Sequence, residues 1–147
     1  MPTYPHEWLA RQIVDQAADA IVFADRDGVI RLWNAGAEAM FGYGVDEAVG
    51  QTLDLIIPER LRDRHWTGFN NTMATGVTRY ARQVLAVPAI RKDGTSISVE
   101  FTVALLHEAS DALVGITAII RDVTARWEEE RALKKRLAAL EAKSSGG

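Results

Sequence analysis

His65 is the side chain in this sequence whose type and spacing most clearly suit chemistry. Leu61, Phe69 and Thr72 recur around it at intervals of three or four, which places them on one face of a helix, with Met73 beside them. If Leu61 and Phe69 face a sheet, His65 faces it too. A neutral imidazole can then hold a metal ion, provided that its second nitrogen has a partner. The alternative is a histidine that only packs in the core or at its edge, and the pattern leaves both open.

Other kinds of active chemistry find little support in the sequence. Cysteine is absent, which excludes disulfides, thiolate zinc sites and cofactors linked through cysteine. His6 and His107 have no histidine or carboxylate at ligand spacing, so both are expected to be exposed. Gly42-Tyr43-Gly44 lacks the further glycine and the preceding strand of a phosphate-binding loop. No nucleophile stands beside a base, so we do not expect an enzyme.

The composition indicates an ordinary globular domain. Of the 147 residues, 48% are hydrophobic, which is enough for a sizeable core. The net charge is only −3 and no basic stripe runs through the chain, so we expect no nucleic-acid partner. The apolar runs are far shorter than a membrane span and the first residues lack a signal core, which predicts a soluble, cytoplasmic protein without membrane contact.

The order of predicted elements indicates the α+β class. Strand-like runs cover residues 20–24, 29–33, 79–90, 96–107 and 113–121, and a long helix covers 58–74 and ends at Gly76. This order predicts one antiparallel sheet with helices on one face. We divide the chain into an N-terminal amphipathic helical cap (1–18), a central domain (19–124), a C-terminal helix (125–143) and a flexible tail (144–147). Apolar residues alternate strictly from Ile97 to Leu105, but alternation alone does not say which parity faces inward.

Two helices are candidates for pairing with a second copy of the chain. Leu133, Leu137 and Leu140 follow the 4–3 spacing of a coiled-coil seam, although the seam is short. The alternative is an amphipathic helix packed on its own domain. The N-terminal helix offers Trp8 and Ile13 as a second surface. We therefore expect a homodimer formed through one of these helices.

A series of short motifs resembles the PAS domain family. In chain order they are Ala24-Asp25-Arg26-Asp27-Gly28-Val29-Ile30, Trp33-Asn34, Phe41-Gly42-Tyr43, Gly50-Gln51-Thr52, Ile57-Pro58-Glu59, Arg91-Lys92-Asp93-Gly94-Thr95 and Arg121-Asp122-Val123-Thr124. The resemblance covers about residues 8–125. It implies a five-stranded antiparallel sheet that cups a ligand against helices, followed here by a signalling helix. It also implies a role in sensing or partner assembly within signalling proteins.

The segment from Ile57 to Trp66 narrows the resemblance. It is similar to the haem-binding PAS domains of rhizobial oxygen-sensing histidine kinases, in which the long helix supplies the axial histidine of a b-type haem. His65 is the matching residue here. Two places depart from that pattern: Gly68 stands where those relatives carry an aromatic residue, and the distal arginine or methionine is replaced by Leu85 or Gln83. Light-reactive flavin domains and coumarate-linked domains are excluded because both need a cysteine.

If the resemblance holds, the cofactor site draws on the long helix and on the last three strands. The implied residues are His65 on the iron, with Leu61, Phe69, Arg79, Gln83, Leu85, Phe101, Val103, Ile116 and Ala118 around it; Ile97 and Val99 are further candidate walls. Arg79 or Arg82 would pair with the haem propionates, or both are solvated strand charges.

Two functions therefore stay open. One is a haem-based gas or redox sensor in a bacterial two-component system, whose signal passes through Asp122 and Thr124 to the terminal helix. The other is a haem-free module for dimerisation or docking, with a small organic ligand or none. In either case the catalytic output lies in a partner, such as a histidine kinase, or in a longer parent protein.

Overall fold

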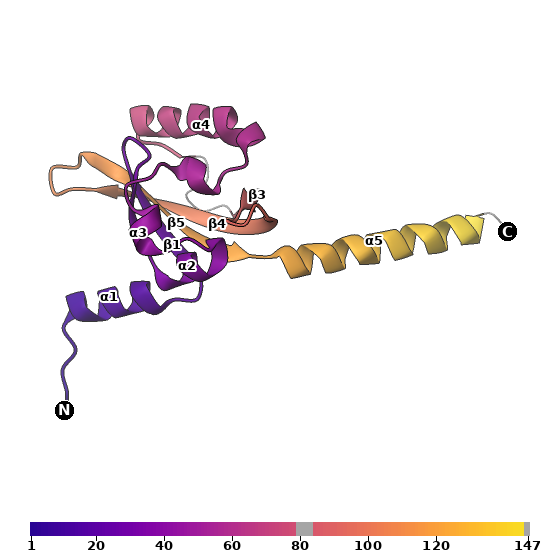
Figure 1. Ribbon diagram of the computed structural model, residues 1–147, viewed down its shortest axis with the longest axis horizontal. Helices are drawn as coiled ribbons and strands as arrows, with labels where there is room; N and C mark the ends of the chain where they lie inside the picture. The colour runs from indigo at the N-terminus through magenta and orange to yellow at the C-terminus, as the bar shows by residue number, and fades with distance from the viewer. Residues whose placement is uncertain (79–83, 146–147) are drawn as a thin grey trace.

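A single antiparallel sheet organises the molecule. This computed structural model describes residues 1–78 and 84–145. The strands β1 (Ala20–Asp25), β2 (Ile30–Trp33), β3 (Leu85–Ile90), β4 (Ser96–His107) and β5 (Leu113–Asp122) lie in the order β2-β1-β5-β4-β3 (Figure 1). Every neighbouring pair is antiparallel. The predicted α+β class and the predicted five-stranded antiparallel sheet are thus confirmed. In its described part the third strand begins at Leu85, because residues 79–83 lie outside the described residues.

The strand register decides which parity faces the helices. Phe101 lies opposite Ile120, and Val103 lies opposite Ala118, so the odd residues of β4 and the even residues of β5 share one face. We call this the inner face. Its buried members Val99 and Ile120 belong to the main core, together with residues of the helices α2 (Ala35–Phe41) and α3 (Val45–Ala48).

Asn34 fixes the junction between the N-terminal helix, the first two strands and α2. Its side-chain oxygen accepts hydrogen bonds from the backbone N–H groups of Ile21 (2.8 Å) and Ala37 (2.9 Å), the second of which caps α2. Its amide nitrogen donates to the carbonyl of Val14, near the end of α1 (His6–Gln16), at 2.7 Å. The amide also donates to the carbonyl of Asp19 at 3.1 Å. One buried side chain thereby satisfies backbone groups from four segments.

The predicted long helix of residues 58–74 is divided in two. Pro58 precedes a short 3₁₀ helix, η2 (Glu59–Leu61), and the α-helix α4 begins only at Arg62 and ends at Thr75. The guanidinium of Arg62 donates to the carbonyls of Ile57 (3.1 Å) and Asp54 (3.3 Å), which holds the bend before α4. Gly76 ends the helix with φ of 71°, as predicted.

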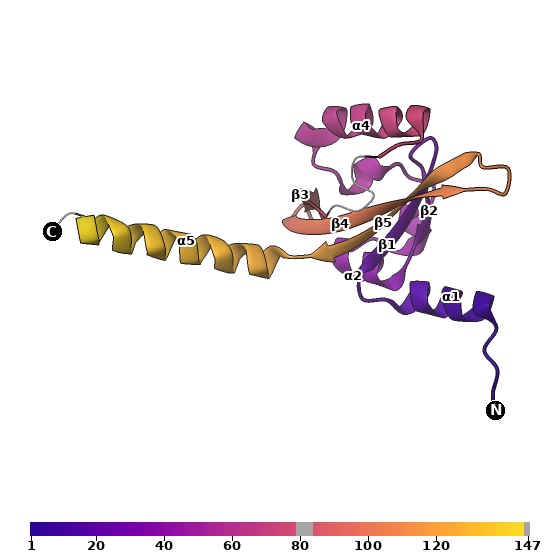
Figure 2. The same ribbon diagram turned by 180° about the vertical axis from the view of Figure 1, so that it is seen from behind.

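Two helices stand away from this core. Neither α1 nor α5 (Thr124–Ser145) has a buried residue among its described residues. Figures 1 and 2 show α5 projecting from the end of β5 into solvent, far beyond the sheet. It starts one residue earlier than the predicted helix of residues 125–143 and runs two residues further, so Ser144 and Ser145 are helical.

Candidate functional site

Polar contacts at both ends hold α4 on the inner side of the sheet. Near its start, the indole nitrogen of Trp66 donates to the Asp54 carboxylate at 2.7 Å. Near its end, the guanidinium of Arg26, in the turn between β1 and β2, donates to the carbonyls of Met73 (3.3 Å) and Leu113 (3.0 Å). These bonds tie α4 to the β1–β2 turn and to the first residue of β5.

The side chain of Trp66 points inward from α4. Its ring lies against Gly28 in the β1–β2 turn, where a Cβ atom would come within 2.2 Å of the indole. Gly28 also has a φ of 77°, which other residues seldom adopt. The absence of a side chain at Gly28 therefore allows both the backbone conformation of the turn and the close contact with the Trp66 ring.

The middle of α4 packs on the far end of the β4–β5 hairpin. Phe69 and Met73 are buried together with Leu113. Leu105 and Ile116 contact this cluster but remain partly exposed. The apolar side of α4 is thus anchored at one end of the inner face.

His65 lies at the edge of this packed side. Its ring contacts that of Trp66 edge-on, with centroids 4.8 Å apart, and lies 5.9 Å from the ring of Phe69. The side chain is only partly exposed, and its Nδ1 atom is buried without a hydrogen-bond partner among the described residues. Burial lowers the pKa of His65 below its ordinary value, although the nearby Asp54 carboxylate opposes this effect. The neutral imidazole, which is the form that binds a metal ion, is therefore favoured.

The inner face beside this cluster is not fully covered. Its members with residual exposure are Phe101, Val103, Leu105, Ile116 and Ala118, and Leu85 on β3, opposite Phe101, is also partly exposed. Ile97, Val99 and Ile120 on the same face are buried. An apolar surface that retains exposure beneath a helix can accept a flat apolar ligand, which usually enters sites lined by hydrophobic side chains.

Several site residues predicted from the sequence can now be placed. His65 and Phe69 lie on α4, while Leu61 is the last residue of η2 and is partly exposed. Arg79, Arg82 and Gln83 lie outside the described residues. Gly68, at the place where the haem-binding relatives carry an aromatic residue, is exposed, and a Cβ atom there would meet nothing within 4 Å.

Three contacts of the site and its output could not be expected from the sequence. The bond from Arg26 to the end of α4 and the bond from Trp66 to Asp54 join residues that no local pattern relates. The third contact is the ion pair between the Glu100 carboxylate on β4 and Arg126 at the start of α5.

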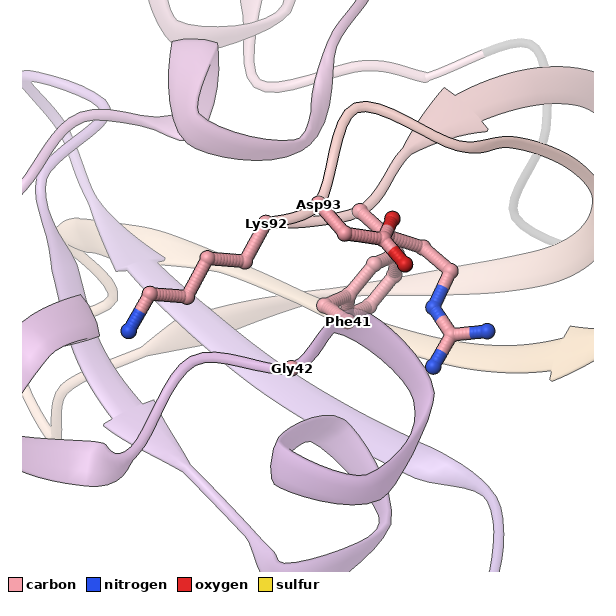
Figure 3. Close-up of a pocket in the computed structure, with 5 residues that line it drawn as sticks. Phe41, Gly42, Lys92 and Asp93 are labelled. Atoms are coloured by element: carbon pink, nitrogen blue, oxygen red, sulfur yellow. The ribbon is translucent and has the colours of Figure 1, made fainter.

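Two surface hollows lie away from His65. One, of about 420 Å³, lies between the end of α2 and the β3–β4 turn and is lined by Phe41, Gly42, Arg91, Lys92 and Asp93 (Figure 3). The other, of about 400 Å³, lies where β3 and β4 meet the first turns of α5, beside Trp127. Both are shallow and charged at the rim, so neither offers the apolar enclosure that a cofactor needs.

Metal clusters and membrane spans are not found in the part of the chain that the structure describes. Within residues 1–78 and 84–145, no three histidine or acidic side chains come together as a metal site would require. None of the described helices combines the length and apolarity needed to cross a bilayer.

Comparison with known proteins places these features in a family. The model of the PAS fold matches residues 9–123. An uncharacterised protein of Azorhizobium caulinodans is 35% identical over 126 residues, covering 85% of this chain and 17% of the relative. The sensor protein FixL of Bradyrhizobium diazoefficiens is 26% identical, with coverages of 85% and 24%. The signal transduction histidine-protein kinase AtoS of Escherichia coli is 29% identical, with coverages of 87% and 20%. The chain thus spans no more than about a quarter of these relatives.

A solved structure supports the fold independently. The PAS domain of a protein from Colwellia psychrerythraea superposes with a TM-score of 0.70 at 23% identity. The match covers 80% of this chain and 96% of the Colwellia domain. At this identity the likeness concerns the fold alone.

Proposed function

This chain belongs to the PAS family, and we propose that it is the sensory module of a signalling protein, with its ligand held between α4 and the inner face of the sheet. The sensor protein FixL and the histidine-protein kinase AtoS, to which this chain is similar, are both much longer than this chain. Any phosphotransfer would then be performed outside the PAS domain, in a longer protein or in a partner kinase.

The ligand that we propose is haem b, with His65 as its axial ligand. The observation that carries this proposal is the buried Nδ1 atom of His65, which lacks a hydrogen-bond partner among the described residues and belongs to a ring that contacts Phe69 on the packed side of α4. A buried imidazole nitrogen without a partner costs free energy, and a bond to a ligand would recover it. Haem iron would supply the ability to bind a gas or to change oxidation state. The resemblance of residues 57–66 to haem-binding PAS domains supports the same choice.

The residues present fit the apolar part of such a group. Phe101, Val103, Ile116 and Ala118 share the inner face and offer an apolar wall, and Leu85 adds to it from β3. Phe69 lies beside His65 on α4 and would pack against the ligand from the helix side. The carboxylates of the group would need a cation, and Arg79 or Arg82 remain the candidates for this role.

A second candidate function is a haem-free module that takes a small organic ligand or only a protein partner. The same partly exposed inner-face residues favour it, because they need no metal to bind an apolar molecule. We propose homodimerisation through α5 under either function, because its Leu133, Leu137 and Leu140 are 57–62% exposed on a projecting helix.

The test is the absorption spectrum of the purified protein during titration with haem, beside His65→Ala and a control, His107→Ala. His107 is exposed at the end of β4, so its removal should leave the spectrum unchanged. We expect a saturable Soret band in the wild type and in the control, and its loss or displacement in His65→Ala. A folded wild type that takes up no haem would overturn the haem proposal and leave the haem-free module.

A further inference from the structure

The two edge strands of the sheet are protected to different degrees. β2 has only four residues, and its first residue, Ile30, is bonded on the outer edge: its N–H donates to the carbonyl of Gln51 at 2.8 Å, and its carbonyl accepts from the N–H of Gly50 at 2.9 Å. A bridge between Val29 and Thr52 extends this contact. β3 is the other edge strand and has six residues, and none of the residues in the described part of the chain pairs with its outer edge. An open edge of this kind can pair with the same edge of a second copy.

The register between β3 and β4 shows which backbone groups of β3 point outward. At the turn between the two strands, the N–H of Arg91 donates to the carbonyl of Thr95. Hydrogen-bonded and non-hydrogen-bonded residue pairs alternate along an antiparallel ladder. Counted back from Arg91, the odd-numbered residues of β3 exchange hydrogen bonds with β4, whereas Ala86, Pro88 and Ile90 direct their backbone groups away from it. Pro88 therefore occupies the middle of the three outward positions.

The side chains of residues 84–90 would otherwise favour pairing at this edge. Apart from Pro88, the segment consists of valine, leucine, alanine and isoleucine, and none of its residues is charged. Val84 is 61% exposed and Val87 is 37% exposed. Uncharged apolar segments of about six or seven residues that contain strand-forming residues and no proline are prone to pair between chains. Pro88 is the one residue that separates this segment from that description.

Pro88 removes the central donor of the outer edge without weakening the sheet of its own chain. Proline has no N–H group, and in sheets it is found where the missing N–H would face solvent. If two β3 edges paired antiparallel around position 88, Ala86 of each copy would face Ile90 of the other, and Pro88 would face Pro88. The central pair would lose both of its hydrogen bonds, because neither copy has the donor. Every antiparallel register that pairs more than one outward residue of β3 includes Pro88.

We propose that Pro88 prevents the open edge of β3 from pairing with the β3 edge of a second copy of this chain. The surroundings show what such pairing would disturb. Ala86 and Pro88 line the hollow of about 400 Å³ at the base of α5, and Leu85 beside them belongs to the inner face. A strand added at this edge would lie next to both and would hold β3 in one position. The role of Pro88 depends neither on the ligand nor on a homodimer through α5.

Restoring the N–H group at position 88 tests this role. Pro88→Thr supplies the donor together with a β-branched side chain, and in sedimentation velocity it should form species larger than those of the wild type at a concentration at least about tenfold lower. Pro88→Ala supplies the donor alone and should change association in the same direction to a smaller extent. Ala86→Thr is the matched control, because its outward N–H is already present, and it should sediment as the wild type does. Circular dichroism verifies the fold of each variant beforehand.

Amide hydrogen exchange locates the contact in the associated Pro88→Thr protein. The amides of Ala86 and Ile90 should exchange more slowly than in the wild type, because they would be hydrogen-bonded between copies. If Pro88→Thr and Pro88→Ala both sedimented as the wild type does over the whole concentration range, the proposed role of Pro88 would be overturned. Association that left the exchange of Ala86 and Ile90 unchanged would overturn it as well, because the contact would then lie elsewhere.

Discussion

At the scale of single residues, His65 links stability to pH. Burial lowers the pKa of its imidazole in the folded protein, while the unfolded chain keeps the ordinary value near 6.5. As pH falls below about 6.5, His65 therefore becomes protonated in the unfolded state while it stays neutral in the folded state. The free energy of unfolding should decrease from this pH down to the folded-state pKa and show no further contribution from His65 below it.

Urea unfolding of the haem-free protein between pH 7.5 and pH 5 measures this effect. The wild type should lose stability more steeply over this range than His65→Gln, which removes the titrating group but keeps a polar side chain. His107→Gln is the control and should follow the wild type. If the free energy of unfolding fell with pH at the same rate in the wild type and in His65→Gln, the imidazole would be as well solvated in the folded protein as in the unfolded chain.

Asn34 is the second residue whose role is local and measurable. Replacing it by alanine removes the hydrogen-bond partner of partly buried backbone groups of Ile21 and Val14. We expect Asn34→Ala to lower the free energy of unfolding by about 2–3 kcal/mol. The control Asn70→Ala, on an exposed turn of α4, should change it by no more than about 0.5 kcal/mol. A loss for Asn34→Ala within the range of the control would contradict this role.

At the scale of elements, Thr124 joins the sheet to α5. Its hydroxyl oxygen accepts a hydrogen bond from the backbone N–H of Ser98 on β4 at 3.0 Å, and its own N–H donates to the Asp122 carboxylate at 2.9 Å. The start of α5 is thus held by β4 and by the end of β5. A shift of either strand on ligand binding would reach the helix through these bonds.

Thr124→Val keeps the shape of the side chain but removes the bond to Ser98. We expect a loss of about 1–1.5 kcal/mol in the free energy of unfolding and faster amide hydrogen exchange over the first two turns of α5. Thr102→Val, on the exposed face of β4, should change neither quantity appreciably. If exchange in α5 were unaltered by Thr124→Val, the junction would have to be held by other contacts.

The helices and strands also show which features of the fold can be predicted from the sequence. Periodicity and turn residues predicted the strands and the stop at Gly76 because these depend on neighbours along the chain. The division of the long helix at Leu61 depends on Arg62 reaching back to carbonyls of the preceding segment, which no helical pattern records. In the same way, the sequence singled out His65 and the inner-face residues as candidates, but it did not predict the bonds of Arg26 to Met73 and of Trp66 to Asp54, which join residues that are distant in the chain.

At the scale of the whole molecule, the proposed ligand site and the output helix α5 lie at different places on the sheet. The inner face carries α4, His65 and the apolar wall, while α5 leaves from the end of β5 and extends away from the domain (Figure 2). A ligand that binds one arrangement of the strands more tightly would shift the protein toward that arrangement and so change the geometry at the base of α5. The free energy that drives this shift equals the difference between the ligand's binding free energies for the two arrangements. Signalling by this route requires that the ligand bind on the inner face.

A titration with haem of two matched variants, Ala118→Leu and Ala104→Leu, tests that requirement most directly. Ala118 lies on the inner face of β5, while Ala104 is exposed on the opposite face of the sheet, and the two replacements add the same volume. We predict that Ala118→Leu, with its fold verified by circular dichroism, binds haem at least about tenfold more weakly than the wild type, and that Ala104→Leu binds it unchanged. Equal binding by both variants, or a loss confined to Ala104→Leu, would contradict a site between α4 and the inner face.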